Sequence, residues 1–486
     1  MTPEHIISRT TSDAEWKSLI FPHDYQNPIP QDKYHLVVIG AGPAGLVTAI
    51  GAAGLGAKVA LIEAKAMGGD CLNVGCVPSK ALLAAAKKVK NGKLSPEKAF
   101  DWVHQVRANI SHHDSVERFS DAGIDVFLGR GKFTDAHTVM VGEAQLKAKA
   151  FVIATGSEPF VPPIAGLESV AVHTNENIFD LQTAPKSIGI LGGGPIGCEM
   201  AQAFADLGSE VHLFEMAEQI LIREHPEAAK LVSDSLEQRG VHLQLGEAVR
   251  QLAPSENGIL VTAGDTSVEV ECVLAAVGRK ANFQQLDLDK AGVETHKRGI
   301  TVDSHFRTSQ KHIFAIGDVS SKYQFTNYAD AQARAVIQNA LFPGNSATNT
   351  DLLPWCTYTK PEIARIGLDA ADAKERGIEV DTYRYDWKDS DRAQTEDDKL
   401  GFVEVLTKKG SDKLLGATIV GSDAGDQIAP LSVMLSTGTG LKDLSASLFC
   451  YPTRSEYLKR LSDAFNKTRL TPTSAKLLKF WLDKTL

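Results

Sequence analysis

Two copies of one short pattern constrain the fold of this chain more than any other feature. Each copy runs from an apolar, β-branched stretch through G-x-G-x-x-G into a helical stretch, then into a second apolar stretch that ends in an acid. The glycines and acids are Gly40, Gly42, Gly45 and Glu63 in the first copy, and Gly192, Gly194, Gly197 and Glu215 in the second. Because strand, glycine turn, helix and strand make a βαβ unit, we predict an α/β fold with two Rossmann-like dinucleotide-binding domains.

The spacing within each copy also predicts what the two domains bind. In such a turn one glycine permits the tight bend, one lets backbone N–H groups approach a pyrophosphate, and one allows helix and strand to pack closely. Glu63 lies 18 residues beyond Gly45 and Glu215 lies 18 beyond Gly197, near the distance expected of an acid that binds a ribose hydroxyl. The alternative is a pair of doubly wound domains that bind no nucleotide. The duplicated context favours two dinucleotide sites.

Composition narrows the class of protein. A chain of 486 residues with 43% hydrophobic and 23% charged residues has room for several ordinary globular domains, which excludes a single small binding module. The formal net charge of -9 gives no broad basic field, so we expect neither nucleic acid nor a membrane as a partner. Residues 1–30 lack the apolar core of a signal peptide, from which we expect a cytoplasmic protein.

A pair of cysteines lies in the segment GGDCLNVGCVPSK, residues 68–80. Pro78 and Ser79 are typical of a first helical turn, which places Cys76 at the positive end of a helix, where a reactive thiolate is stabilised. Cys71 would be its partner in a reversible disulfide, and two ordinary buried thiols are the alternative. The six cysteines are too few for a disulfide framework and too dispersed for a structural zinc site, so we expect no resident metal.

The cysteine segment, the two glycine turns and the later segment AIGD, in this order, resemble the class I pyridine nucleotide-disulfide oxidoreductases. The resemblance covers roughly residues 34–466. It implies that the first unit binds FAD, that the second binds a nicotinamide dinucleotide, and that a C-terminal domain forms a homodimer whose active site is shared between subunits. The further cofactor-binding positions that it implies are Gly131, Thr155, Gly156, Gly278, Asp318 and Thr326.

The resemblance also implies roles for the residues around the cysteine pair. Cys76 would lie against the flavin as the charge-transfer thiolate, and Cys71 would exchange with the substrate. Lys80 would pair with Glu199 beside the flavin and tune it, which makes Lys80 both a catalytic and a cofactor-binding residue. A hydride would pass from nicotinamide to flavin, and two electrons would then reduce the disulfide, which in turn reduces an external disulfide, a metal ion or a small oxidant.

One position departs from the family pattern. Dihydrolipoyl dehydrogenases and glutathione reductases carry a histidine that works with a glutamate as acid and base across the dimer. Here Tyr451 takes the histidine's place while Glu456 remains, and a phenol of pKa about 10 is a poor base at neutral pH. The tyrosine and the DRA segment at residues 391–393 favour a mercuric reductase-like enzyme, although the chain ends without the metal-capturing cysteine pair of that branch.

We therefore predict an NADH-dependent FAD enzyme that is mercuric reductase-like. The alternatives are a dihydrolipoyl dehydrogenase and, from another class, a redox-sensing or thiol metal-binding flavoprotein. NADH should be preferred over NADPH because the Glu215 carboxylate repels a 2′-phosphate, and the segment MAEQIL that follows offers no arginine.

The predicted domain order follows from these motifs. We place an N-terminal extension at 1–33, the FAD-binding domain at 34–157 and 279–350, the NAD(P)-binding domain at 158–278, an α+β dimerisation domain at 351–470 and a helical tail at 471–486. Apolar residues recur at helical spacing in the tail. Because the tail is short and its charge is mixed, we expect it to dock on the domain surface rather than on a membrane.

Overall fold

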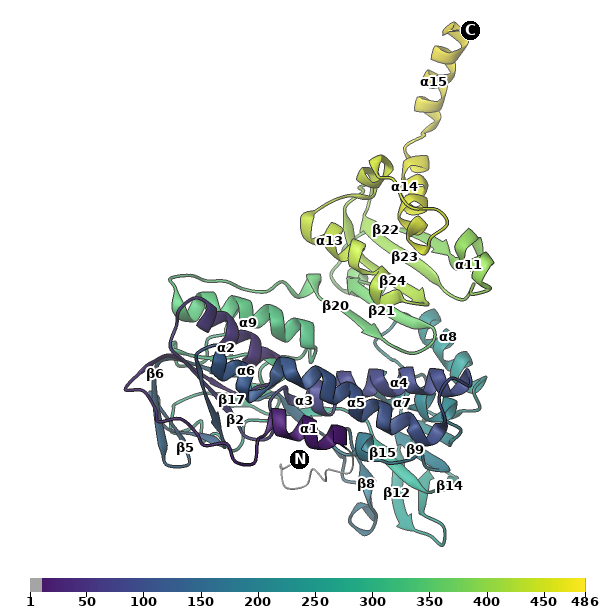
Figure 1. Cartoon of the computed structure of the whole chain (residues 1–486). Helices are drawn as coiled ribbons and strands as arrows, with labels where there is room; N and C mark the ends of the chain where they lie inside the picture. Colours follow the sequence, from purple (N-terminus) through teal and green to yellow (C-terminus); the bar gives the residue numbers. More distant parts are fainter. Residues whose placement is uncertain (1–10, 486) are drawn as a thin grey trace. The chain divides into compact units, whose positions relative to one another are not determined.

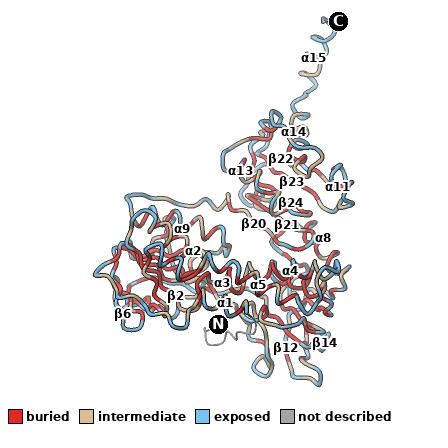
Figure 2. The backbone as a smooth tube through the Cα atoms, in the orientation of Figure 1, coloured by how far each residue is buried: buried red, intermediate tan, exposed pale blue. Residues whose placement is uncertain are grey.

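The computed structural model describes residues 11–485, which form two compact units. The first unit contains the described residues up to Glu218 together with Arg239–Thr348, and the second contains Gln219–Gln238 and the described residues from Asn349 onward (Figure 1). In both units buried strands lie beneath more exposed loops (Figure 2). The finer domain boundaries stay predictions.

The first predicted βαβ unit belongs to a sheet in the first unit. Its parallel strands are β1 (Tyr34–Ile39), β2 (Val59–Glu63), β3 (Ile124–Leu128), β6 (Ala144–Ile153) and β19 (Ile313–Ala315), and antiparallel strands β4 (Gly131–Asp135) and β5 (Thr138–Val141) extend it. The order is β3-β2-β1-β6, with β19 also paired to β6. Along β1, Leu36 and Val38 enter one core and Val37 and Ile39 enter another, so both faces of the sheet are buried.

Helices cover this sheet and the cysteine segment. Those of this part of the chain are α1 (Thr11–Ile20), α2 (Pro43–Gly54), α3 (Gly69–Asn73), α4 (Cys76–Lys90), α5 (Ala99–Ser111), α6 (Val116–Asp121) and α9 (Thr326–Leu341). Helix α2 packs against α9, and small buried residues such as Ala49 and Ala333 line that core. Helix α1 packs against α5 through buried Trp16 and Ile20, so the predicted N-terminal extension joins the core of the first unit.

The second predicted βαβ unit forms a separate parallel sheet in the same unit. Its order is β11 (His242–Leu245), β10 (Glu210–Glu215), β9 (Ser187–Leu191), β15 (Cys272–Ala275) and β8 (Val172–His173), and helix α7 (Pro195–Asp206) follows β9. An antiparallel sheet of β12 (Val249–Pro254), β13 (Ile259–Ala263) and β14 (Thr266–Val270) packs on one face through an apolar cluster that includes Phe214, Leu252 and Val261. The duplication read from the sequence is therefore present as two sheets.

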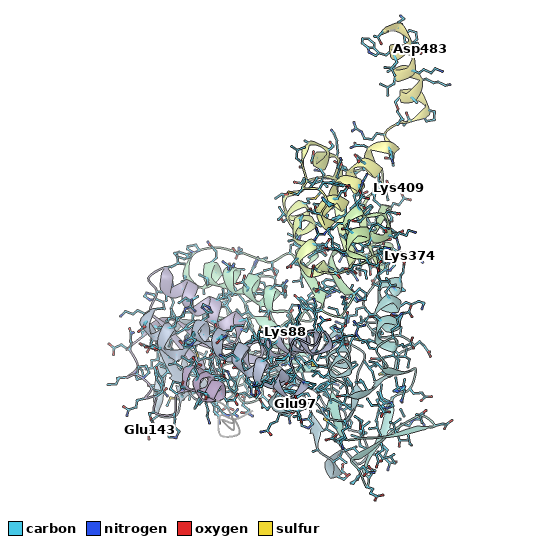
Figure 3. The ribbon with its side chains drawn as sticks, turned by 45° about the vertical axis from the view of Figure 1, so that its right-hand side comes forward. Lys88, Glu97, Glu143, Lys374, Lys409 and Asp483 are labelled. Carbon is cyan, nitrogen blue, oxygen red and sulfur yellow. The ribbon has the colours of Figure 1, made fainter. Side chains whose placement is uncertain are left out.

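Two short antiparallel ribbons complete the first unit. They pair β7 (Ser157–Pro159) with β16 (Arg279–Ala281), and β17 (Thr295–His296) with β18 (Gly299–Ile300). Charged side chains such as Glu97 and Glu143 project from the surface of this unit (Figure 3). Strand β7 follows β6 of the first parallel sheet, and β16 follows β15 of the second. Their pairing therefore brings these two segments side by side.

The second unit is built on an antiparallel sheet. Its strand order is β20 (Pro354–Thr357), β21 (Glu362–Gly367), β24 (Leu414–Gly421), β23 (Phe402–Lys408) and β22 (Val380–Asp386). The helices of this unit are α8 (Pro226–Glu237), α10 (Ala370–Glu375), α11 (Asp391–Glu396), α12 (Ala424–Gln427), α13 (Ala429–Thr437), α14 (Tyr457–Thr468) and α15 (Pro472–Thr485). One core joins Trp387, Ile419 and Leu461, which confirms the predicted α+β region.

The C-terminal tail is helical, as predicted, but its predicted docking on the domain surface is wrong for this single chain. Helix α15 contains no buried residue, and Leu477 and Trp481 are 70% and 67% exposed. Figure 2 shows the helix exposed along most of its length. Among residues 11–485, no helix is both long enough and apolar enough to cross a membrane.

Candidate functional site

The first glycine turn, between β1 and α2, has no room for side chains at two of its three glycines. Gly40 has a φ of +105°, and a Cβ there would lie 2.4 Å from the carbonyl oxygen of Ala154. A Cβ on Gly45 would lie 1.7 Å from the Gly40 carbonyl oxygen. At Gly42 the nearest atom to an added Cβ is the Gly69 Cα, 3.8 Å away, so space remains beside the N-terminus of α2. The turn therefore has the shape that brings backbone N–H groups to a phosphate.

The second turn, between β9 and α7, repeats this geometry. Gly192 has a φ of +106° and an added Cβ would lie 2.6 Å from the Ala276 carbonyl oxygen. A Cβ on Gly197 would lie 1.9 Å from the Gly192 carbonyl oxygen, whereas a Cβ on Gly194 would meet no atom within 4 Å. In both turns, therefore, the first glycine has a positive φ, the second leaves open space, and the third packs closely against the first.

Each predicted ribose-binding acid is the last residue of its strand and accepts a hydrogen bond from a backbone N–H group of the glycine turn. Glu63 accepts hydrogen bonds from the backbone N–H groups of Ala41 at 2.7 Å and Lys65 at 2.6 Å. Burial raises the pKa of Glu63, and those N–H groups oppose the rise. Glu215 accepts the Gly193 N–H at 2.7 Å. A carboxylate fixed in this way beside the turn fits the position of a ribose ligand.

The two cysteines lie side by side as thiols at the start of α4. Helix α4 begins at Cys76 itself, two residues before the predicted proline, while Cys71 lies on the short helix α3. A hydrogen bond from Cys71, aided by Thr326 and Lys80 and opposed by burial, lowers the pKa of Cys76 to about 6. The same contact, together with burial, raises the pKa of Cys71. These opposite shifts favour Cys76 as the thiolate and Cys71 as the thiol.

The predicted partners Lys80 and Glu199 are brought together. The Lys80 Nζ lies 2.7 Å from Glu199 Oε2, and the carboxylate is buried on α7. Helix α4 packs against α7, so this ion pair joins the cysteine helix to the helix that follows the second glycine turn. The Thr326 Oγ1 lies 3.6 Å from the Cys76 Sγ, which places a third predicted residue at the thiolate.

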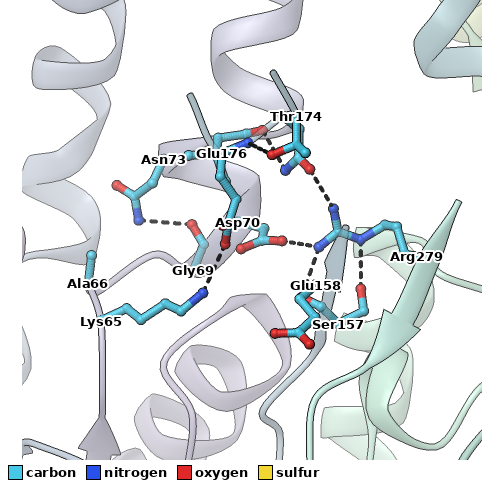
Figure 4. A network of polar contacts seen from close by, with 12 residues as sticks. Lys65, Ala66, Gly69, Asp70, Asn73, Ser157, Glu158, Thr174, Glu176 and Arg279 are labelled. Carbon is cyan, nitrogen blue, oxygen red and sulfur yellow. Dashed lines mark hydrogen bonds and ion pairs between the residues drawn. The ribbon is translucent and has the colours of Figure 1, made fainter. Parts of the chain in front are cut away.

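Arg279, on β16, links the cysteine segment to Ser157 on β7 (Figure 4). Its guanidinium pairs with Asp70, the residue before Cys71, and its Nε donates to Ser157 Oγ at 2.7 Å. The Ser157 hydroxyl donates in turn to Asp318 at 2.6 Å, and burial raises the pKa of that carboxyl. Sequence reasoning missed Asp70 and Arg279, although Asp70 lies within the cysteine segment and Arg279 follows the predicted residue Gly278.

Three of the four remaining predicted cofactor residues, Thr155, Gly156 and Gly278, lie beyond the ends of parallel strands. Thr155 follows β6 and donates its hydroxyl to the Asn282 carbonyl at 2.5 Å. Gly156 and Gly278 have φ values of +68° and +133°, and neither would meet an atom within 4 Å of an added Cβ. Gly131 opens β4, where Ile39, Ile62 and Val139 all lie 3.4 Å from an added Cβ, so protein side chains fill that space.

In the second unit, Tyr451 and Glu456 have separate partners. The Tyr451 hydroxyl donates to Asp391 Oδ2 at 2.9 Å, a contact that raises the pKa of the phenol, and the side chain is 70% exposed. Glu456 is buried, with Oε1 2.7 Å from Arg460 and with no hydrogen-bond partner for Oε2 among the described residues. Sequence reasoning had noted the DRA segment but missed Asp391 as the partner of Tyr451.

Comparison with known proteins agrees with this geometry. Residues 34–333 match the family described as pyridine nucleotide-disulphide oxidoreductase, and residues 353–462 match its dimerisation domain. The chain is 33% identical over 457 residues to a mercuric reductase of Lysinibacillus sphaericus, covering 90% of this chain and 84% of that protein. It is 32% identical over 443 residues to a dihydrolipoyl dehydrogenase of Chlamydia muridarum, covering 87% and 95%.

A solved structure is also similar over most of its length. It is the Cu(II) complex of the HOCl-induced flavoprotein disulfide reductase RclA from Escherichia coli, with a TM-score of 0.82 and 28% identity over 89% of this chain and 100% of that one. The chain belongs to the pyridine nucleotide-disulfide oxidoreductase family, which confirms the family and fold class predicted from the motifs. Within that family it is a flavin-dependent disulfide oxidoreductase that uses FAD and a pyridine nucleotide and has a dimerisation domain.

Proposed function

We propose that this enzyme takes electrons from NADH and passes them through Cys71 and Cys76 to a metal ion or a small oxidant, as a mercuric reductase-like flavoprotein. Tyr451 is the observation that carries the proposal. It replaces the interface histidine of the relatives that act on dithiols, and its hydroxyl is bound to Asp391. Because this contact raises the pKa of the phenol, Tyr451 does not serve as a base at neutral pH.

The glycine turns and their acids fit the two cofactors. The open positions Gly42 and Gly194 leave room for a pyrophosphate at the N-termini of α2 and α7. The proposed FAD ligands are Gly40, Gly42, Gly45, Glu63, Lys80, Thr155, Gly156, Asp318 and Thr326, with Gly131 able to contribute only through its backbone because side chains surround it. The proposed nicotinamide dinucleotide ligands are Gly192, Gly194, Gly197, Glu215 and Gly278. When bound, FAD supplies two-electron transfer between the nicotinamide and the cysteine pair.

The cysteine pair has the asymmetry that the reaction needs. Cys76, with its pKa of about 6, is held as a thiolate near Lys80 and Thr326, and Cys71 is left to meet the acceptor. When the reduced pair gives up two electrons, to one mercuric ion or to two cupric ions, the two sulfurs join as a disulfide and the Cys71 proton leaves, since Cys76 is already a thiolate. Oxidation of a dithiol substrate would need a base for the substrate's own thiol proton, which Tyr451 does not provide.

The similar proteins support the choice of acceptor class. Mercuric reductases are among the relatives at 31–33% identity, and the similar Escherichia coli reductase is described as HOCl-induced and was solved with Cu(II). Mercuric ion, cupric ion and hypochlorite are therefore the first acceptors to test. Lipoamide is also tested, for two reasons. Dihydrolipoyl dehydrogenases are among the relatives, and Glu456 is buried with one oxygen that has no hydrogen-bond partner among the described residues.

NADH preference and a shared active site belong to the same proposal. Glu215 is fixed beside the second glycine turn, where a carboxylate favours a ribose 2′-hydroxyl over a 2′-phosphate. The match to the dimerisation domain supports a homodimer, in which Tyr451 and Glu456 of each subunit would serve the cysteine pair of the other. Sedimentation analysis of the FAD-loaded enzyme should give the mass of two chains.

Steady-state NADH oxidation with a panel of acceptors tests the proposal. Mercuric ion, cupric ion or hypochlorite should sustain turnover, whereas lipoamide and glutathione disulfide should be slower by about 10²–10⁴-fold, the effect of a missing acid–base group that protonates the leaving thiolate in this direction. Tyr451→His should raise lipoamide activity, because Glu456 can then orient an imidazole, and Tyr451→Phe should impair the native reaction. Turnover of lipoamide at the rate of flavin reduction would replace this proposal with a dihydrolipoyl dehydrogenase. A single reduction without turnover would indicate a sensor.

A further inference from the structure

Three side chains with metal-binding chemistry meet on the second parallel sheet, away from its nucleotide-binding edge. Glu210 and His212 alternate along β10 and so lie on the same face of the sheet. His242 on β11 is paired directly with His212 in the parallel register. Strand β11 is an edge strand, so these three side chains lie at one edge of the sheet.

The distances within this group suit one small cation. The His212 Nε2 lies 3.1 Å from Glu210 Oε1, and the rings of His212 and His242 stack with centroids 4.6 Å apart and planes 17° from parallel. One ligand atom from each of the three residues lies within 4.8 Å of the others. Metal–nitrogen and metal–oxygen bonds of about 2.0–2.2 Å therefore require only small side-chain rotations.

A fourth residue, Gln244, is placed to orient His212. The Gln244 amide Nε2 lies 3.4 Å from His212 Nδ1, and its Oε1 is buried with no hydrogen-bond partner among the described residues. A half-turn of the amide exchanges these two atoms without a change of shape. The Gln244 oxygen then accepts the His212 Nδ1 proton, and the lone pair of Nε2 points toward Glu210. Metal-binding histidines are held by second contacts of this kind.

We propose that Glu210, His212 and His242 bind one divalent first-row transition metal ion per chain, of the class of Zn²⁺ or Cu²⁺. Two imidazole nitrogens and one carboxylate oxygen suit these ions better than soft Hg²⁺, which favours thiolates, or Ca²⁺ and Mg²⁺, which favour oxygen alone. Glu210 and His242 are exposed while His212 is buried, so a bound ion keeps a position open to water.

The site is separate from the proposed electron-transfer site. Glu210 opens β10 and Glu215 ends it, so the proposed ligand Glu210 and the ribose-binding acid lie about 16 Å apart along the strand. A bound ion would clamp the edge strand β11 to β10 and stabilise the nucleotide-binding sheet. No sequence pattern indicates this site, because His212 and His242 are 30 residues apart and follow no recognised ligand spacing.

Equilibrium binding of Zn²⁺ and Cu²⁺ to the full-length enzyme tests the proposal. The enzyme is used with Cys71 and Cys76 oxidised to a disulfide, so that these thiols do not compete. We expect one ion per chain, and electron paramagnetic resonance of the Cu²⁺ form should show nitrogen hyperfine structure from two imidazoles. His242→Asn should weaken binding by more than about tenfold, with loss of one nitrogen from the spectrum.

The chain contains a matched control for stacked histidines. His137 and His312 also stack, with centroids 4.4 Å apart and planes 18° from parallel, but no third ligand accompanies them in the described part of the chain. His137→Asn should therefore leave binding and the spectrum unchanged. Gln244→Leu should weaken binding by about 10–100-fold, and Gln244→Glu should restore it, because a carboxylate also accepts the Nδ1 proton.

The outcomes are distinct from those of the acceptor panel, since this test does not depend on turnover. Unchanged affinity in His242→Asn, a Cu²⁺ spectrum without imidazole nitrogen, or no binding of either ion at about 1 mM would overturn the site. If His137→Asn weakened binding as much as His242→Asn does, the site would also be overturned. The pair of His137 and His312, which has no third ligand among the described residues, would then bind the ion equally well, and the Glu210 carboxylate would not select the site.

Discussion

Removing the Cys71 thiol tests what makes Cys76 a thiolate. The hydrogen bond from Cys71 is the largest influence on the pKa of Cys76, with Thr326 and Lys80 acting in the same direction and burial opposing them. Cys71→Ala deletes the donor, whereas Cys71→Ser keeps a donor in a side chain of nearly the same size. Comparison of the two variants therefore separates the hydrogen bond from the other influences.

The size of the effect follows from the strength of such a bond. A hydrogen bond to a charged group contributes about 1.5–3 kcal/mol, which moves a pKa by about one to two pH units. In the reduced parent enzyme Cys76 should titrate near its pKa of about 6. In Cys71→Ala it should titrate at about pH 7–8, and in Cys71→Ser it should stay close to the parent value. The thiolate exists above each midpoint, so the alanine variant loses it at a higher pH as the solution is acidified.

Two readouts measure this midpoint. One is the long-wavelength thiolate-to-flavin band of the FAD-loaded enzyme, recorded against pH after two-electron reduction of the parent. The other is the rate of alkylation by iodoacetamide, which follows the thiolate fraction. Cys76→Ser should abolish the band, and Cys71→Ser should retain it even in the oxidised enzyme. Equal midpoints in Cys71→Ala and the parent would refute the role of the hydrogen bond, and a band that survives in Cys76→Ser would reverse the assignment of the two cysteines.

Three further changes probe the cofactor sites and the N-terminal helix. Glu215→Ser should lower the preference for NADH over NADPH by at least about tenfold in kcat/KM, because a like-charge conflict is removed; an unchanged ratio would show that another group selects the cofactor. Gly197→Ala puts a Cβ 1.9 Å from the Gly192 carbonyl oxygen and should lower the thermal midpoint, at a cost of about 1–3 kcal/mol. Its control, Gly194→Ala, meets no atom within 4 Å and should keep the midpoint while raising the KM for NADH, so equal stability losses would contradict the packing argument. Trp16→Phe removes the indole N–H that donates to Asn73 Oδ1 at 2.9 Å, which should lower the free energy of unfolding by about 1–3 kcal/mol; no change in thermal midpoint would mean that α1 does not brace the cysteine segment.

The sequence determined the features whose requirements are local. Gly40 and Gly192 have positive φ values, and Cβ atoms on Gly45 and Gly197 would overlap carbonyl oxygens five residues earlier, so only glycine fits these positions. The start of a helix at Cys76 is equally local, because the residues that follow favour a first helical turn. Both βαβ units and the helix that begins within the cysteine segment were therefore predictable before the structure.

Some residue pairs were predicted only from the family resemblance, and the distance between their side chains depends on the fold. Lys80 and Glu199 are 119 positions apart, and their 2.7 Å contact depends on how α4 packs on α7. The helical tail shows the opposite case, since its apolar spacing predicted a docked helix and the single chain offers it no surface. Amphipathic spacing shows which apolar residues of a helix favour burial, but it does not identify the surface that buries them.

Other contacts were decided by the tertiary structure alone. Arg279 pairs with Asp70 across 209 positions, Tyr451 reaches Asp391 across 60, and His242 lies beside His212 only because β11 pairs with β10 in one particular register. A local pattern specifies the backbone conformation of a segment and the face that it buries. Strand order, register and helix packing decide which distant side chains share that face, and they follow from the free energy of the whole core rather than from any one segment.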